Sequence, residues 1–172
     1  KRQDTDSLVG DLTLNGITVT FNQGSDGTQL GDIDGTGNLV KNGAGDLALT
    51  GTNTYSGGTT INAGTLTGDA DSLQGNIANN GTGLIFDQSG TGTFTGAISG
   101  TAAVEKMGAG TLTINTAQTY SGTTYLTDGV LAVSASNNLG DGSGTNNLYF
   151  YDGTLSSDNS NHGFTLGAKM KF

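Results

Sequence analysis

Short bursts of alternating apolar and polar residues recur along most of the chain. Successive residues of a β-strand face opposite sides, so each burst would place one side chain in a core and the next in solvent. The clearest bursts lie at residues 47–49, 59–61, 112–114 and 124–126. Between them lie Asn-Gly, Ala-Gly, Ser-Gly and Asp-Gly pairs, whose residues favour tight turns. The pattern predicts an all-β chain of short strands, because no 3.6-residue apolar period indicates a helix.

The first long burst spans residues 17–21, where we expect Ile17, Val19 and Phe21 to point inward. In the glycine-rich stretch after residue 66, Leu73 is expected to be an inward anchor. The chain contains no proline, which suits strands that are hydrogen-bonded on both sides.

One 26-residue stretch occurs twice. Residues 41–66, KNGAGDLALTGTNTYSGGTTINAGTL, return as residues 106–131, KMGAGTLTINTAQTYSGTTYLTDGVL, and twelve of the 26 positions are identical. Such self-similarity is typical of repeat proteins, in which each unit buries its apolar face by stacking on the next. We therefore predict a parallel β-helix, or solenoid, with about three strands and about 20 residues per coil, so that each repeat fills about three coils. A meander of antiparallel hairpins is the competing interpretation.

The chain is strongly acidic. Its 15 Asp and Glu residues oppose six Lys and Arg residues, and Lys41 and Lys106 are the only basic residues away from the two ends. The formal net charge of −9 repels phosphate groups, so nucleic acid and anionic membranes are poor partners. No apolar run approaches the ~20 residues of a membrane-spanning helix and no signal peptide is recognisable, so we expect a mature fragment or a soluble segment without membrane insertion. The absence of cysteine excludes disulfides and thiolate metal sites.

Paired carboxylates are the main candidates for chemistry. Asp32/Asp34 and Asp69/Asp71 each place two carboxylates on one face of an extended segment, as glycoside hydrolysis or lyase chemistry could use. Both pairs lie in turn sequences, GDIDG and GDADS, and the positions 65 residues later are uncharged. We favour turn capping, with weak Ca²⁺ binding as an alternative. His162 lies in a polar loop and is expected to be solvated, so we assign no catalytic, cofactor-binding or metal-binding residue.

Three residue types are expected to shape the coils. Tyr55 and Tyr120 are equivalent in the repeat and are expected in the core or at a corner rather than in a sugar-binding platform. Asn38 and Asn53 are expected to form internal side-chain ladders. Threonines bracket an inward residue at 18/20, 65/67, 93/95 and 111/113. Their uneven spacing favours an ordinary strand surface over an ice-binding array.

The repeat resembles a known family. Its pattern, L-x-K-x-G-x-G-x-L-x-L-x-G-x-N-x-Y-x-G-x-T-x-I-x-x-G-x-L, is similar to the passenger-associated repeat of bacterial autotransporters, also described as the autotransporter-associated β-strand repeat. The matching residues are Leu39, Lys41, Gly43, Gly45, Leu47, Leu49, Gly51, Asn53, Tyr55, Gly57, Thr59, Ile61, Gly64 and Leu66. The second copy departs from it at Val104, Ile114, Thr116, Gln118 and Leu126. Further similarity downstream extends the likeness to about residues 35–167.

The resemblance implies a right-handed parallel β-helix in the passenger of a bacterial surface protein, secreted or displayed on the exposed side of the Gram-negative outer membrane. It implies a structural or adhesive role, as a stalk or a self-associating adhesin, and it does not imply a catalytic activity. We therefore expect that this segment is not an enzyme. We expect N-terminal coils or a cap at 1–34, a first β-helix repeat at 35–99, and a second repeat with a C-terminal coil at 100–172. The closing run 164–172 also resembles the last strand of an outer-membrane barrel, but we expect it to form the final coil.

Two other functions stay open. Neither end of the chain shows an obvious cap, so exposed strand edges could join units into an extracellular filament or sheath. Alternatively, the acidic pairs could lie in a groove that binds or cleaves a polysaccharide. The expected partners are a protein or glycan on a cell surface, or further copies of the chain through β-helix edges and ends. No cofactor is expected.

Overall fold

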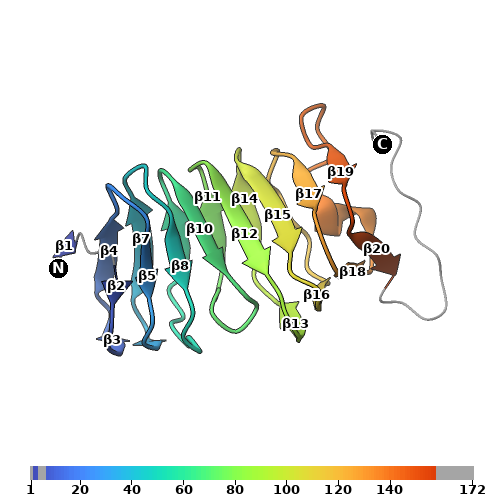
Figure 1. Cartoon of the computed structure of the whole chain (residues 1–172). Helices are drawn as coiled ribbons and strands as arrows, with labels where there is room; N and C mark the ends of the chain where they lie inside the picture. The colour runs from blue at the N-terminus through green and yellow to red at the C-terminus, as the bar shows by residue number, and fades with distance from the viewer. Residues whose placement is uncertain (1, 4–6, 158–172) are drawn as a thin grey trace.

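The computed structural model describes residues 2–3 and 7–157, with side chains from residue 9 onward, and shows a stack of parallel strands (Figure 1). All strand pairs among these residues are parallel. The chain advances coil by coil along one axis from its N-terminus to the last described strand (Figure 1). The predicted parallel β-helix is confirmed, and the antiparallel meander is wrong.

The strands form four sheets. The first contains, in spatial order, β1 (Arg2–Gln3), β4 (Thr18–Asn22), β7 (Asn38–Asn42), β9 (Thr59–Ile61), β11 (Ile77–Asn79) and β14 (Ile98–Gly100). The second contains β2 (Ser7–Leu8), β5 (Gly27–Gln29), β8 (Leu47–Leu49), β10 (Thr65–Gly68), β12 (Gly83–Asp87), β15 (Ala103–Met107), β17 (Thr124–Leu126) and β19 (Leu148–Phe150). The third contains β13 (Thr91–Phe94), β16 (Thr111–Ile114), β18 (Val130–Val133) and β20 (Thr154–Ser157). A fourth, short sheet pairs β3 (Leu12–Leu14) with β6 (Ile33–Gly35).

The third side of some coils is extended chain rather than a strand. Between β8 and β9, the backbone N–H of Thr54 donates to the carbonyl oxygen of Ile33 at 2.8 Å, and that of Ser56 donates to Gly35 at 2.9 Å. These bonds run between coils, as in a sheet, although no strand is formed there. A single 3₁₀ turn, η1 (Ser136–Leu139), follows β18. None of the helical structure in residues 7–157 is long and apolar enough to cross a membrane.

The core is a set of apolar columns that run through successive coils. Leu47 stands in register between Gly27 and Leu66, and the column continues through Leu84 and Val104. Its leucine and valine side chains are at most 3% exposed. Burying one such side chain contributes about 1.5–3 kcal/mol, so a column stabilises the stack only when every coil keeps its register. Leu47 thus packs between its neighbours in the two adjacent coils.

The two sequence repeats lie on different sides of the helix. Lys41 is in the first sheet, between Phe21 and Ile61, whereas Lys106 is in the second sheet, between Phe86 and Leu126. The 65-residue spacing therefore corresponds to three coils and one further side, rather than to three coils alone. Equivalent residues of the two copies consequently lie on different sides of the helix axis.

The strand predicted at residues 17–21 begins one residue later than expected, at Thr18. Ile17 is 58% exposed, because it precedes β4 and lies at a corner instead of in the strand. Phe21 is buried and Val19 is half-buried against the core, as predicted. Leu73 is also buried, in the loop between β10 and β11.

Candidate functional site

The carboxylate of Asp32 is hydrogen-bonded to the backbone of the next coil. Its Oδ1 accepts a 2.8 Å hydrogen bond from the backbone N–H of Thr52. The N–H of Asp32 in turn donates to Oδ1 of Asp11 in the preceding coil, at 2.9 Å. Asp34 is exposed on the same outer side of β6. Asp11 and Asp32 thus form a row of carboxylates that tie successive coils together.

The second acidic pair, Asp69 and Asp71, lies in the loop after β10. Oδ1 of Asp69 accepts hydrogen bonds from the backbone N–H groups of Asp71, at 3.1 Å, and Ser72, at 2.8 Å. Oγ of Ser72 accepts a 2.7 Å bond from the N–H of Asp69. This reciprocal arrangement is a turn in which the aspartate side chain accepts hydrogen bonds from the backbone N–H groups of its own loop. Because the two pairs lie in different coils, they do not form one four-carboxylate site.

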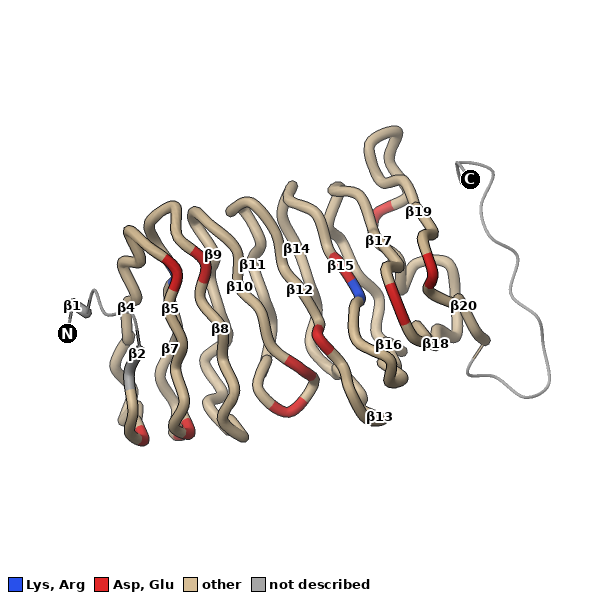
Figure 2. Tube along the Cα trace, in the orientation of Figure 1, with Lys and Arg blue, Asp and Glu red and all other residues tan. Residues whose placement is uncertain are grey.

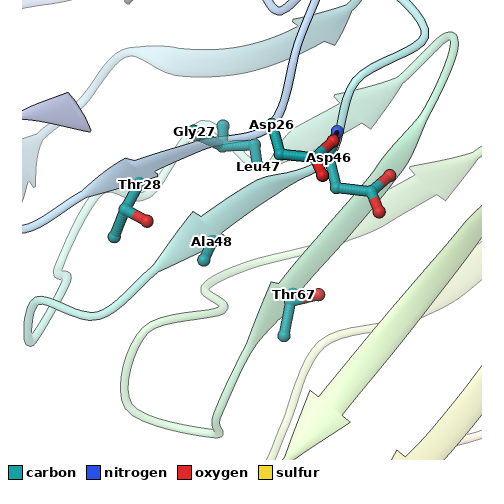
Figure 3. A pocket seen from close by; sticks show the side chains of 7 residues that line it. All are labelled: Asp26, Gly27, Thr28, Asp46, Leu47, Ala48 and Thr67. Carbon is teal, nitrogen blue, oxygen red and sulfur yellow. Dashed lines mark hydrogen bonds between the residues drawn. The ribbon is translucent and has the colours of Figure 1, made fainter. Parts of the chain in front are cut away.

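A shallow groove of about 300 Å³ lies on the outer face of the second sheet (Figure 3). Asp26 and Asp46 stand at one end of it, and a row of small side chains from β5, β8 and β10 lines the rest. Oδ1 of Asp26 accepts from the N–H of Asp46 at 2.8 Å, and Oδ1 of Asp46 accepts from the N–H of Thr65 at 3.0 Å. Both carboxylates therefore cap the neighbouring coil, and the groove offers few further polar groups.

The most unusual polar residue of the first repeat is Lys41, whose side chain is 0% exposed. Its Nζ donates to three backbone carbonyl oxygens, those of Asn42 at 3.1 Å, Gly43 at 2.8 Å and Ala63 at 3.0 Å. A Cβ atom on Gly64 would lie 2.7 Å from this Nζ. The lysine and the glycine that closes the repeat motif thus form one unit that joins the corners of two coils.

Lys106 repeats this arrangement on another side of the helix. It is 1% exposed, and its Nζ donates to the carbonyl oxygens of Met107 at 2.8 Å, Gly108 at 2.6 Å and Asp128 at 3.2 Å. Gly129 takes the place of the closing glycine, with φ at 66°. The lysine and glycine positions shared by the two copies are therefore explained by a structural role.

Burial lowers the pKa of both lysines below their ordinary value of 10.5. Nearby carboxylates oppose this effect: Asp46 and then Asp26 raise the pKa of Lys41, and Asp128 and then Asp87 raise that of Lys106. Three carbonyl dipoles also favour the charged ammonium, because each accepts one of its protons. The two lysine ammonium groups thus interact with carbonyl and carboxylate groups of the stack and add no positive charge to its outer surface.

The outer surface consequently carries one sign of charge. From residue 9 to residue 157, every Asp and Glu is exposed or half-buried, while the lysines in that range, at 41 and 106, are both buried. Figure 2 shows acidic positions spread over the coils from end to end. The described surface therefore favours partners with positive charge and repels anionic ones.

The repeated tyrosines belong to the core. Tyr55 and Tyr120 are each 1% exposed. Their hydroxyl groups share a hydrogen bond with Oγ1 of Thr59, at 2.7 Å, and of Thr124, at 2.6 Å. Burial raises the pKa of both phenols above 10.0. The prediction that these tyrosines are core residues is confirmed.

Asn53 links coils through the backbone. Its Oδ1 accepts from the N–H of Ile33 at 2.8 Å, and its Nδ2 donates to the carbonyl oxygen of Ser72 at 2.6 Å. In the second copy Gln118 accepts from the N–H of Ile98 at 2.5 Å, so the longer amide preserves this link.

The asparagine ladder lies elsewhere than predicted. Asn38 is exposed, so the expectation of an internal ladder there is wrong. Instead, Nδ2 of Asn62 donates to Oδ1 of Asn42 at 2.9 Å, and Nδ2 of Asn42 donates to Oδ1 of Asn22 at 3.3 Å.

The threonine surface is short. Thr91 and Thr93 of β13 are in register with Thr111 and Thr113 of β16, but Val130 and Ala132 take these positions in the next coil. The array is thus two coils deep, as expected for an ordinary strand surface.

An aromatic cluster on the second sheet was missed in the sequence. The rings of Tyr125 and Tyr149 stack with their centroids 5.8 Å apart, and Tyr151 lies 6.3 Å from Tyr125. Tyr151 is 67% exposed. The signal was the outward phase of Tyr125 and Tyr149 in their strands. The sequence did not reveal the cluster because the two tyrosines lie 24 residues apart and Tyr149 lies outside the duplicated stretch 106–131.

No group of three or more metal-binding side chains occurs among the described residues. His162 and the closing run 164–172 lie outside the described residues.

Comparison with known proteins identifies the repeat. Residues 39–67 and 104–133 match the passenger-associated-transport-repeat family. The adhesin BmaC autotransporter of Brucella suis biovar 1 (strain 1330) is 44% identical to this chain over 139 residues, which cover 66% of this chain and 4% of the relative. The chain thus spans about 4% of the length of that relative. No solved structure matches the chain.

Proposed function

Because this chain carries two passenger-associated transport repeats, we propose that it is a non-catalytic segment of the passenger of a bacterial autotransporter, exposed at the cell surface. In this role it is a rigid stalk whose outer face also contributes to adhesion. Similarity to an autotransporter adhesin supports both the location and a non-enzymatic role.

The observation that carries this proposal is the continuous stacking of coils. The second sheet alone contains eight parallel strands, which span roughly 35 Å at about 4.8 Å per strand. Backbone hydrogen bonds between parallel strands tie successive coils together, and at particular coils the carboxylate of Asp46 and the buried ammonium of Lys41 add further links. Such a rod holds the parts of the protein at its two ends a fixed distance apart and presents a long outer face, as a stalk requires.

Attachment assays test the proposal. Bacteria displaying the parent protein are compared with bacteria displaying a deletion of residues 39–133, which removes both repeats. We expect the deletion to reduce attachment to protein-coated or cell-coated surfaces, with surface abundance matched by an antibody against another part of the parent. Unchanged attachment and unchanged cell–cell aggregation would contradict the proposal.

A replacement variant separates the two parts of the role. If residues 39–133 are exchanged for the same length of an unrelated β-helix, a stalk role alone predicts full recovery of attachment. Because we propose an adhesive face as well, we expect partial recovery. The division into parts at 1–34, 35–99 and 100–172 stays a prediction, and limited proteolysis of the chain is its test.

A further inference from the structure

We propose that the outer face of β15, β17 and β19 binds a basic polypeptide segment, whose ammonium and guanidinium groups lie against the rings of Tyr125, Tyr149 and Tyr151. This inference rests on the proposed adhesive function and deepens it, because it names the chemistry of the partner.

Tyr125 and Tyr149 form a platform because strand alternation turns both outward, and Tyr151 joins them from the bend that follows β19. Their strand neighbours Thr124, Leu126 and Leu148 are buried, so the intervening ring positions must face solvent. Tyr125 and Tyr149 are direct partners in adjacent coils. Their planes are inclined by 22°, and that of Tyr151 is inclined by 31° to Tyr125. Aromatic faces carry partial negative charge and attract cations placed over them, so a cation would lie over a ring face that the stack of Tyr125 on Tyr149 leaves uncovered.

Two acidic residues, Glu105 and Asp152, lie near this platform. Glu105 is in register with Tyr125 one coil earlier, and its Oε1 accepts a 2.5 Å bond from Oγ1 of Thr127. The exposed Asp152 directly follows Tyr151, and its N–H donates to the carbonyl oxygen of Thr127 at 3.2 Å. Glu105 therefore lies on the same outer face as Tyr125, and Asp152 is an exposed acidic residue next to Tyr151 in the chain.

The negative charge of this face favours a basic ligand over a neutral one. A neutral sugar could stack on a tyrosine ring and donate hydroxyl hydrogen bonds to the carboxylates, but it carries no charge that the negative potential of this face would attract. A lysine or arginine side chain gains from both the ring and the carboxylate, and no exposed basic side chain between residues 9 and 157 competes with it.

The spacing of the rings suits an extended chain. The ring centroids of Tyr149 and Tyr151 lie 5.8 and 6.3 Å from that of Tyr125, close to the spacing of about 6.6 Å between alternate side chains on one face of an extended peptide. In a segment with a basic residue at every second position, the spacing of the basic side chains therefore matches the spacing of the rings.

Isothermal titration calorimetry on the full chain tests the proposal with three probes. These are an octapeptide of alternating arginine and glycine, the same peptide with uncharged citrulline in place of arginine, and a hexamer of N-acetylglucosamine. We expect the arginine peptide to bind and the other two to show no saturable heat. Raising the ionic strength from about 0.1 M to about 1 M should weaken binding, because the Debye length falls from about 10 Å to about 3 Å.

Four variants locate the site. Tyr149→Thr and Glu105→Gln should each weaken the arginine peptide by about two- to fivefold, whereas Tyr149→Phe, which keeps the ring, should bind as tightly as the parent chain. Asp34→Asn removes the same charge as Glu105→Gln at a distant strand and should have no effect. Thermal unfolding followed by circular dichroism confirms that each variant is folded.

Three results would overturn the proposal: no binding of the arginine peptide, equal weakening by Asp34→Asn and Glu105→Gln, or binding of the sugar hexamer that Tyr149→Thr abolishes. If the arginine peptide fails to bind while deletion of residues 39–133 still reduces attachment, this inference falls and the proposed function stands.

Discussion

Replacing Lys41 with methionine tests whether the buried ammonium stabilises the stack. Methionine fills a similar volume and removes only the donor group. Three hydrogen bonds, at 3.1, 2.8 and 3.0 Å, are lost. A hydrogen bond to a charged group contributes about 1.5–3 kcal/mol, but the substitution also removes the cost of burying a charge, which is several kcal/mol. Because three carbonyl groups lose their donor together, we expect a net loss of about 2–4 kcal/mol in the free energy of unfolding.

Urea denaturation near neutral pH, followed by circular dichroism, measures this loss. Lys106→Met should show a loss of the same size, since its ammonium has the same kind of partners. The double variant should lose the sum to within about 0.5 kcal/mol, because the two sites lie in different sheets and share no partner. Val40→Thr, an outward position beside Lys41, is the control and should change stability by no more than about 0.5 kcal/mol. A Lys41→Met variant as stable as the parent would refute the reasoning, because it would show that desolvation outweighs the three bonds.

Three further changes test other parts of the stack. Gly64→Ala should cost at least about 2 kcal/mol, because its Cβ would lie 2.3 Å from a backbone oxygen at a φ of 67°, whereas Gly90→Ala has open space and should change stability by less than about 1 kcal/mol; equal urea midpoints would contradict this. Asn53→Ala should cost about 2–3 kcal/mol and speed hydrogen exchange at the Ile33 amide, and an unchanged exchange rate would count against the link between coils. Burial raises the pKa of Tyr120 above 10.0, so the unfolded chain releases that proton at lower pH than the folded chain. Stability should therefore fall as pH rises past 10.0, and Tyr120→Phe should reduce that fall in urea titrations across this range.

The fold could be predicted because two independent patterns agree. Period-2 alternation indicates strands, and the repeat indicates that strands from successive coils stack. The phase of the repeat could not be predicted, because 65 residues is not a whole number of coils. Coil length varies with the loops: Thr65 pairs with Gly83, but Thr124 pairs with Leu148. The corner before β4 could not be predicted either, because Ile17 continues the apolar alternation of the strand although this residue lies outside the strand.

The site was harder to predict than the fold. The sequence marks Lys41 and Lys106 as repeated and isolated basic residues, but their burial depends on carbonyl groups that converge only when two corners meet. The stacking of Tyr125 on Tyr149 depends on the exact pairing of β17 with β19 across a 24-residue coil. Neither contact follows from local sequence, since both join residues that are brought together only by the register of the stack.

Disulfide crosslinking tests the parallel register most directly, because the chain contains no cysteine of its own. Thr28 and Ala48 are partners in adjacent coils, as are Ala48 and Thr67, whereas Thr28 and Thr67 are two coils apart. Adjacent strands place Cα atoms about 4.8 Å apart, within the range of a disulfide, while two strands place them about 10 Å apart, beyond its limit of about 7 Å. On mild oxidation, cysteine pairs at 28/48 and at 48/67 should form intramolecular disulfides, and a pair at 28/67 should not. Crosslinking at 28/67, or its absence at the two adjacent pairs, would contradict the parallel stack.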